Sequence, residues 1–198
     1  AVLNGMVNRG KGGAPAAQSA YVVTIMRGTY GKDTGTPKDF LLADGIGVGY
    51  GARDFADGID AVYFVAQENY PVEFLESGYP VRLRTYGVVP DSGGPGRWRG
   101  GTGIIREYEI LADEMRLALR IDGVTNPPWG YAGGKSAGVG GAWVNPGTPG
   151  EKVIPPLSDG TLLKKGDVLR IRTGGGGGMG HPYDRPAESV LEDVLGGF

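Results

Sequence analysis

The sequence contains no cysteine, a single histidine and no long uninterrupted apolar segment. The lack of cysteine excludes disulfide bonds, cysteine-ligated zinc and the small secreted folds that disulfides stabilise. Without a run of about 18 apolar residues, no segment is predicted to span a membrane. The first residues lack the basic start and apolar stretch of a signal peptide. A cytoplasmic protein is therefore expected.

The sequence also lacks an excess of charge of either sign. Its 20 Lys and Arg residues are balanced by 22 Asp and Glu residues, which leaves a net charge of −2. No basic surplus is available to neutralise a nucleic-acid backbone. Nucleic acid is therefore not an expected partner.

Glycine is the residue in excess. The chain has 39 glycines and 14 prolines among 198 residues, whereas glycine ordinarily accounts for about 7% of a protein. It also has 10 tyrosines, 3 tryptophans and regular segments of Val, Ile and Leu, which a disordered chain would lack. The composition favours an ordered, loop-rich β protein whose turns use glycine.

Short segments rich in β-branched and aromatic residues predict strands. The predicted strands cover residues 21–26, 61–66, 81–89, 104–111, 115–121 and 168–172. The polar link 112–114 indicates a hairpin between two of them. Alternating glycine in residues 44–51 indicates close approach of backbones or positive φ, and residues 122–156 show no clear pattern.

Helices are predicted only after Pro71 and over residues 185–194. Because turns rather than long helices join most strands, the fold class is mainly β (α+β). We expect one antiparallel, β-rich lobe over residues 1–198, with long glycine-rich loops and a short C-terminal helix.

Five consecutive glycines, Gly174 to Gly178, form the sharpest local motif. Successive amides without side chains can bind an anion, so Gly175, Gly176 and Gly177 are candidate substrate- or anion-binding residues. The motif lacks the spacing of a nucleotide-binding loop. The alternative is a tight structural passage beneath other parts of the chain.

His181, close behind the glycine run, is the candidate catalytic residue, because an imidazole can transfer a proton near neutral pH. Alternatively, it is a hydrogen-bonded structural histidine. With no second histidine and no cysteine, the usual transition-metal cluster cannot be assembled from this chain alone, so no metal ligand is predicted.

Two further segments are candidate anion- or substrate-binding sites. Arg97 and Arg99 flank Trp98, so two guanidiniums and a stacking surface could bind an anion. Alternatively, the arginines brace neighbouring loops or a partner subunit. Gln67, Glu68 and Asn69 group a carboxylate with amides at a predicted strand end, where functional groups are common.

Four segments together resemble the hydantoinase B/oxoprolinase family. They occur in the order of that family and extend over essentially the whole chain. They are Val7–Pro15 (VNRGKGGAP), Asp57–Asp60 leading to Gln67–Glu73 (QENYPVE), Asp91–Gly103 (DSGGPGRWRGGTG) with Arg106-Glu-Tyr108, and Thr173 followed by the glycine run.

The resemblance implies the C-terminal portion of a B-type subunit that acts with a hydantoinase A-type ATPase subunit in a hetero-oligomer. ATP and Mg are expected on that partner. A divalent metal, Zn or Mn, is expected in an N-terminal B-type portion, present as another chain or fragment. This chain alone is expected to bind neither and to be inactive alone.

The resemblance implies an ATP-dependent hydrolase of cyclic amides such as hydantoins, 5-oxoproline or lactams. The first alternative is a subunit of an ATP-dependent ketone carboxylase of the acetone or acetophenone type. The second is a non-catalytic scaffold or binding module. The residues do not separate the hydrolase from the carboxylase, and a split gene and a cleaved chain are both compatible with the sequence.

Overall fold

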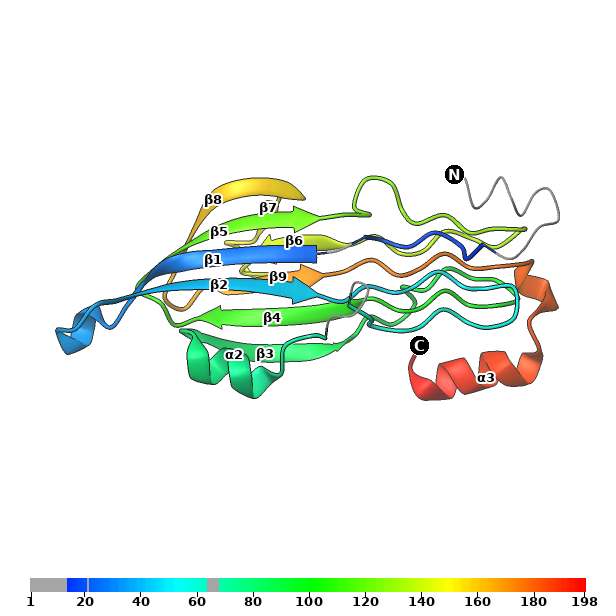
Figure 1. Cartoon of the computed structure of the whole chain (residues 1–198), viewed down its shortest axis with the longest axis horizontal. Coiled ribbons are helices and arrows are strands. Elements are labelled where there is room, and N and C mark those ends of the chain that lie inside the picture. Colours follow the sequence, from blue (N-terminus) through cyan, green and yellow to red (C-terminus); the bar gives the residue numbers. More distant parts are fainter. Residues whose placement is uncertain (1–13, 21, 64–67) are drawn as a thin grey trace.

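The computed structural model describes residues 14–20, 22–63 and 68–198. Within them, nine strands form two antiparallel sheets that face each other (Figure 1). The four-stranded sheet has the order β2 (Lys38–Ile46), β1 (Val22–Tyr30), β5 (Glu114–Ile121) and β8 (Leu157–Lys164). The five-stranded sheet has the order β3 (Val81–Val88), β4 (Ile104–Ile110), β9 (Val168–Arg172), β6 (Gly141–Val144) and β7 (Lys152–Ile154).

Helices are few and lie outside the sheets (Figure 1). Helix α2 (Val72–Gly78) precedes β3, and α3 (Ala187–Gly196) lies near the C-terminus. Two 3-10 turns, η1 (Lys32–Thr34) and η2 (Pro182–Asp184), complete the set among the described residues. The predicted fold class is confirmed: antiparallel sheets dominate, and glycine-rich loops and a short C-terminal helix accompany them.

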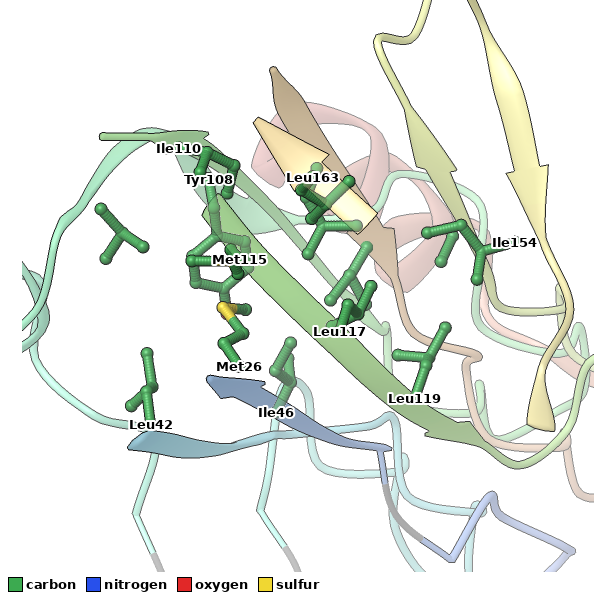
Figure 2. Packing of buried hydrophobic residues seen from close by; sticks show 14 of the residues in the cluster. Met26, Leu42, Ile46, Tyr108, Ile110, Met115, Leu117, Leu119, Ile154 and Leu163 are labelled. Carbon is green, nitrogen blue, oxygen red and sulfur yellow. The ribbon is translucent and has the colours of Figure 1, made fainter. Parts of the chain in front are cut away.

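The core lies between the two sheets because both supply an apolar face. Residues of β4 alternate between buried and half-buried along the strand, and those of β5 nearly so, as expected for strands with one face in the core. Figure 2 shows side chains of this layer, among them Met26 and Leu42 of one sheet and Tyr108 and Ile110 of the other. Burial of these side chains is the main source of stability for the sandwich.

The predicted hairpin of residues 104–111 and 115–121 is wrong. Both strands exist, but β4 pairs with β3 and β9, whereas β5 pairs with β1 and β8. The link between them crosses from one sheet to the other, and the Asp113 amide donates to the Thr29 carbonyl at 3.0 Å. The alternation of apolar and polar residues identifies which face of a strand meets the core. It does not identify the sheet to which the strand belongs, because strands of both sheets show the same alternation.

Other parts of the strand prediction also differ from the structure, and β2 and β8 were not predicted. Residues 61–63 of the predicted 61–66 strand form a turn and an isolated bridge from Val62 to Val48, and residues 64–66 lie outside the described residues. The segment 122–156, which shows no clear pattern in the sequence, contains β6 and β7. Both are very short, so too few residues were available to show a period.

Beyond the sheets, extended segments run side by side around the glycine run (Figure 1). The run is hydrogen-bonded to its neighbours with a period of three residues. The Gly175 and Gly178 amides donate to the carbonyls of Gly138 and Lys135, at 3.2 and 3.0 Å. One residue further along, the same spacing of three occurs with a different neighbouring segment. The amides of Gly176 and Met179 donate to the carbonyls of Gly101 and Trp98.

A period of three residues is typical of the polyproline II helix. We call this region, formed by residues 174–180 and the segments 16–17, 49–52, 94–101 and 131–138 bonded to them, the glycine bundle. Gly174 to Gly178 are all buried. A Cβ atom at Gly175, Gly176 or Gly177 would overlap a backbone carbonyl of a neighbouring segment. Glycine is required here for close backbone approach.

Candidate functional site

Two predicted binding residues line a depression on the outer face of the four-stranded sheet. Glu68 is exposed, and Asn69 is half-buried. The depression has a volume of about 610 Å³ and is lined by Val23, Ala43, Gly45, Tyr63, Glu68, Asn69, Tyr70 and Pro71. Gln67, the third residue predicted with them, lies outside the described residues.

The depression owes its shape to the alternation of the strands and to one glycine. Val23, Ala43 and Gly45 point outward because their neighbours Val22, Leu42 and Ile46 fill the core. A Cβ atom at Gly45 would overlap the Tyr63 ring, so glycine makes room for that side chain. Burial, followed by the negative charge of Asp44, raises the pKa of Tyr63. Tyr63 is therefore a neutral hydroxyl that can donate a hydrogen bond.

Asn69 fixes the wall of this depression. Its Nδ2 donates to the Ala61 carbonyl at 3.0 Å, and its Oδ1 accepts from the Gly47 amide at 2.7 Å. The side chain thus ties the end of β2 to the segment that returns along it. Both polar atoms of Asn69 are occupied, so its part is to hold Glu68 and Tyr70 in place.

A buried ion pair lies behind the depression, and our sequence reasoning missed it. Arg106 and Asp44 are both fully buried, and Arg106 Nη1 lies 2.9 Å from Asp44 Oδ2. The Tyr108 hydroxyl donates to the same carboxylate oxygen at 2.5 Å, and Arg106 Nη2 donates to the Tyr70 carbonyl at 3.1 Å. The two sheets and the wall of the depression are thereby joined through one guanidinium.

The electrostatics of this group follow from its burial. Burial raises the pKa of the Asp44 carboxyl, and Arg106 and Tyr108 partly offset that rise. Burial and the charge of Asp44 raise the pKa of Tyr108 well above its usual range, so the phenol remains a donor. The sequence did carry a signal: Arg106 lies on the buried face of an alternating strand, and an arginine there requires a carboxylate partner.

The two arginines predicted to bind an anion have different surroundings. Arg97 is exposed, and its guanidinium carbon lies 5.9 Å from the centre of the Trp98 ring. Arg99 is mostly buried, with Nη1 at 2.9 Å from Asp60 and Nε at 3.2 Å from Asp193. Arg99 therefore joins two loops through carboxylates of this chain, and binding of an external anion by Arg97 and Arg99 stays a prediction.

Arg99 belongs to a larger charged network at the far end of the glycine bundle. Arg185 donates to both oxygens of Asp57 at 2.8 Å and to Asp193 at 2.7 Å. Burial alone would raise the pKa of Asp57, but hydrogen bonds from the Arg185 side chain and the Arg99 amide, together with both positive charges, lower it. Asp57 is therefore ionised at neutral pH. No spacing in the sequence indicated this cluster.

The glycine run does not offer free amides. The amides of Gly175, Gly176 and Gly177 donate to the carbonyls of Gly138, Gly101 and Ala17 at 2.8–3.2 Å. The prediction that these amides bind an anion is therefore corrected. Their donors are used inside the bundle, and the tight structural passage is the alternative that the structure supports.

His181 lies at the opposite end of the bundle from the depression. It is exposed, and its Nδ1 accepts from the Tyr183 amide at 3.3 Å. Asn69 is bonded to Gly47, near the Gly174 end, and the seven steps from residue 174 to residue 181 span roughly 20 Å at about 3.1 Å each. The predicted residues therefore form two groups, Glu68 with Asn69 and Arg97 with Arg99 and His181.

Residues 14–20, 22–63 and 68–198 contain no group of three or more His, Asp or Glu side chains that could hold a metal ion. The carboxylates that do converge, those of Asp57, Asp60 and Asp193, are neutralised by guanidiniums. This part of the chain does not fit a divalent metal. Over the same residues, no helix combines the length and the apolar character that crossing a membrane requires.

Comparison with known proteins places these features in a family. Residues 2–182 match the family described as Hydantoinase B/oxoprolinase. A candidate B-type subunit of a D-/L-hydantoinase from Pseudomonas sp. (strain NS671) is 36% identical over 152 residues, 75% of this chain and 26% of that protein. The beta subunit of caprolactamase from Pseudomonas jessenii is 34% identical over 159 residues, 76% of this chain and 27% of that protein.

A solved structure shows the same fold. Nucleotide-free acetone carboxylase aligns with a TM-score of 0.74 and 18% identity, over 93% of this chain and 29% of that chain. The chain spans about a quarter of the length of the hydantoinase and caprolactamase subunits it matches. Since the match extends over residues 2–182, the chain belongs to the Hydantoinase B/oxoprolinase family.

Proposed function

We propose that the chain is part of an ATP-dependent hydrolase of cyclic amides, in which it acts as a portion of the B-type subunit. The observation that carries this proposal is the family match over residues 2–182, together with relatives named as a hydantoinase subunit and a caprolactamase subunit. The depression, with the Glu68 carboxylate and the Tyr63 hydroxyl, suits a small ligand with apolar and hydrogen-bonding groups.

The proposal includes partners and cofactors. A hydantoinase A-type ATPase would supply ATP and Mg, and an N-terminal B-type chain or fragment would supply a divalent metal, Zn or Mn. In support, the relatives are named as subunits. We expect a cytoplasmic complex in which this chain alone is inactive.

A ketone carboxylase is the second candidate. The shared fold with acetone carboxylase favours it, but at 18% identity the likeness establishes fold alone. The identity to the caprolactamase beta subunit is 34%, which favours the hydrolase. A non-catalytic scaffold has no comparable support.

We expect the tagged chain, purified from its native source, to retain an ATPase subunit and a further B-type portion. The isolated complex should hydrolyse ATP faster with hydantoin, 5-oxoproline or caprolactam in bicarbonate-free buffer. Mass spectrometry identifies the partners, and a coupled phosphate assay gives the rate. Stimulation only by a ketone with bicarbonate would establish the carboxylase, and a chain that purifies without partners would contradict both enzymes.

His181 remains the proposed proton-transfer group of this chain. Because its imidazole is exposed and accepts a single hydrogen bond, His181→Ala should leave folding and assembly intact. If the imidazole transfers a proton, kcat of the complex should fall by about 100-fold or more. The measurement is amide hydrolysis at saturating ATP. An unchanged kcat in a fully assembled complex would assign His181 no catalytic part.

A further inference from the structure

Helix α3 is attached to the rest of the protein through charge and through a limited apolar contact, in which the Arg99 guanidinium lies 4.7 Å from the centre of the Phe198 ring. It lies beside the glycine bundle in Figure 1 and contains no buried residue. Val190, Leu191, Val194 and Leu195 are 45%, 59%, 68% and 79% exposed. No side chain of α3 is fully removed from water, so the hydrophobic effect contributes less to its attachment than it does in the core.

The main attachment of α3 is the Asp193 carboxylate. Its Oδ1 accepts from Arg99 Nε at 3.2 Å, and its Oδ2 accepts from Arg185 Nη2 at 2.7 Å. The two guanidiniums thus bind one carboxylate from both sides. Both arginine side chains are mostly buried, 15% and 9% exposed, so the charge-assisted bonds form away from bulk water.

The two arginines are held in this arrangement without α3. Asp60 accepts from Arg99, and Asp57 accepts from Arg185 with both oxygens. The charges of the two guanidiniums are already balanced by the carboxylates of Asp57 and Asp60, and Asp193 adds a third carboxylate. Arg185 Nε is also buried and has no hydrogen-bond partner in the described structure. The pair is therefore preformed and retains a donor that Asp193 does not use.

A cavity of about 270 Å³ opens beside this pair, between α3 and the glycine-rich loops. Apolar groups form much of its wall, among them Pro95, Pro182, Val190, Val194 and Phe198. A ligand for this space would combine a carboxylate with a short apolar portion.

We infer that Arg99 and Arg185 form a carboxylate-binding site, that Asp193 of α3 occupies it in this structure, and that a carboxylate of another molecule takes its place when α3 moves away. Arg185 stays in the site when α3 moves away, because Asp57 holds its guanidinium. The movement of α3 therefore begins after Arg185, at Pro186. The carboxylate belongs either to a small organic acid or to an acidic side chain of a partner protein. The inference does not depend on the proposed function.

Occupation by Asp193 makes a definite prediction about affinity. A ligand that binds only the open arrangement has its apparent affinity reduced by the fraction of molecules that are open. Asp193→Asn removes the charge of the competing group, and the affinity for pentanoate should rise about tenfold or more. Pentanamide, which has the same size and no charge, should not bind either protein. Titration calorimetry of the full chain at low ionic strength measures both ligands.

Control variants separate the site from general effects of charge. Glu192→Gln removes the neighbouring exposed carboxylate of α3 and should leave pentanoate affinity at the level of the unaltered chain. Adding Arg99→Gln to Asp193→Asn should abolish the gain. Hydrogen exchange of residues 187–196 should quicken in Asp193→Asn and stay unchanged in Glu192→Gln.

A synthetic peptide of residues 186–198 distinguishes the two sources of the carboxylate. If the Asp193→Asn chain binds pentanoate, the site accepts small acids. If the Asp193→Asn chain binds only the peptide, and a peptide that itself carries Asp193→Asn fails to bind, the site binds an acidic side chain of a protein. If the Asp193→Asn chain binds neither ligand, or binds pentanoate equally well without Arg99, the inference is overturned.

Discussion

Alanine at position 176 is expected to destabilise the protein by about 3 kcal/mol or more, because the new Cβ atom has no space to occupy. It would overlap the Tyr50 carbonyl and approach the Gly51 amide nitrogen at 2.5 Å. Both neighbours are backbone atoms, and neither can rotate away as a side chain would. Gly176 also donates to Gly101 and accepts from Gly94, so a shift of its backbone breaks bonds in two directions.

Urea unfolding followed by circular dichroism and tryptophan fluorescence measures this effect. Gly87→Ala is the matched control, because Gly87 lies in β3 and its Cβ position meets no atom within 4 Å. The control should change stability by no more than about 1 kcal/mol, in the direction of greater stability if anything. Equal unfolding midpoints for Gly176→Ala and the unaltered chain would show that the bundle tolerates side chains.

Arg106→Met should have the second large effect, a loss of about 3–5 kcal/mol. Methionine fills similar volume, but it leaves the Asp44 carboxylate fully buried without its guanidinium and the Tyr70 carbonyl without its donor. The cost is that of an uncompensated buried charge. Because Arg106 is bonded to the wall of the depression, the segment of Tyr70 should also exchange its amide hydrogens faster.

Two further variants test that explanation. Combining Arg106→Met with Asp44→Leu and Tyr108→Phe makes the cluster wholly apolar, and most of the lost stability should return. Arg27→Met breaks an exposed pair with Asp159, 4.0 Å apart, and should cost less than about 1 kcal/mol. If the triple variant is no more stable than Arg106→Met, the buried charge is not the cause.

Local pattern predicted several elements of the fold. The alternation in Ile104–Ile110 and the position of Pro71 were sufficient to place β4 and α2. Pairing was not accessible in this way, because β4 and β5 present the same burial pattern from opposite sheets. The partner of each strand depends on contacts between residues far apart in sequence, which periodicity does not encode.

The surroundings of the candidate site residues were less accessible from the sequence than the residues themselves. Glu68 and Asn69 line a depression, and their part in binding stays a prediction, whereas the amides of Gly175–Gly177 are used within the bundle. A run of five glycines indicates that side chains are excluded at residues 174–178. It does not indicate whether a ligand or another segment of the chain lies against them. Likewise, Arg99 pairs with Asp60 and Asp193. Both lie too far from Arg99 in the sequence for a local motif to include them.

The glycine run follows its hydrogen-bond partners in the sequence, and this order has a consequence for biosynthesis. Its hydrogen-bond partners include Ala17, Gly49, Gly101 and Gly138, all of which leave the ribosome earlier. Until residues 174–178 are translated, these segments lack the central element that satisfies their backbone groups. Such long-range contacts form slowly, and domains fold as units during synthesis. We therefore expect the bundle to assemble only after residues 174–178 have been translated, and after the strands that precede them.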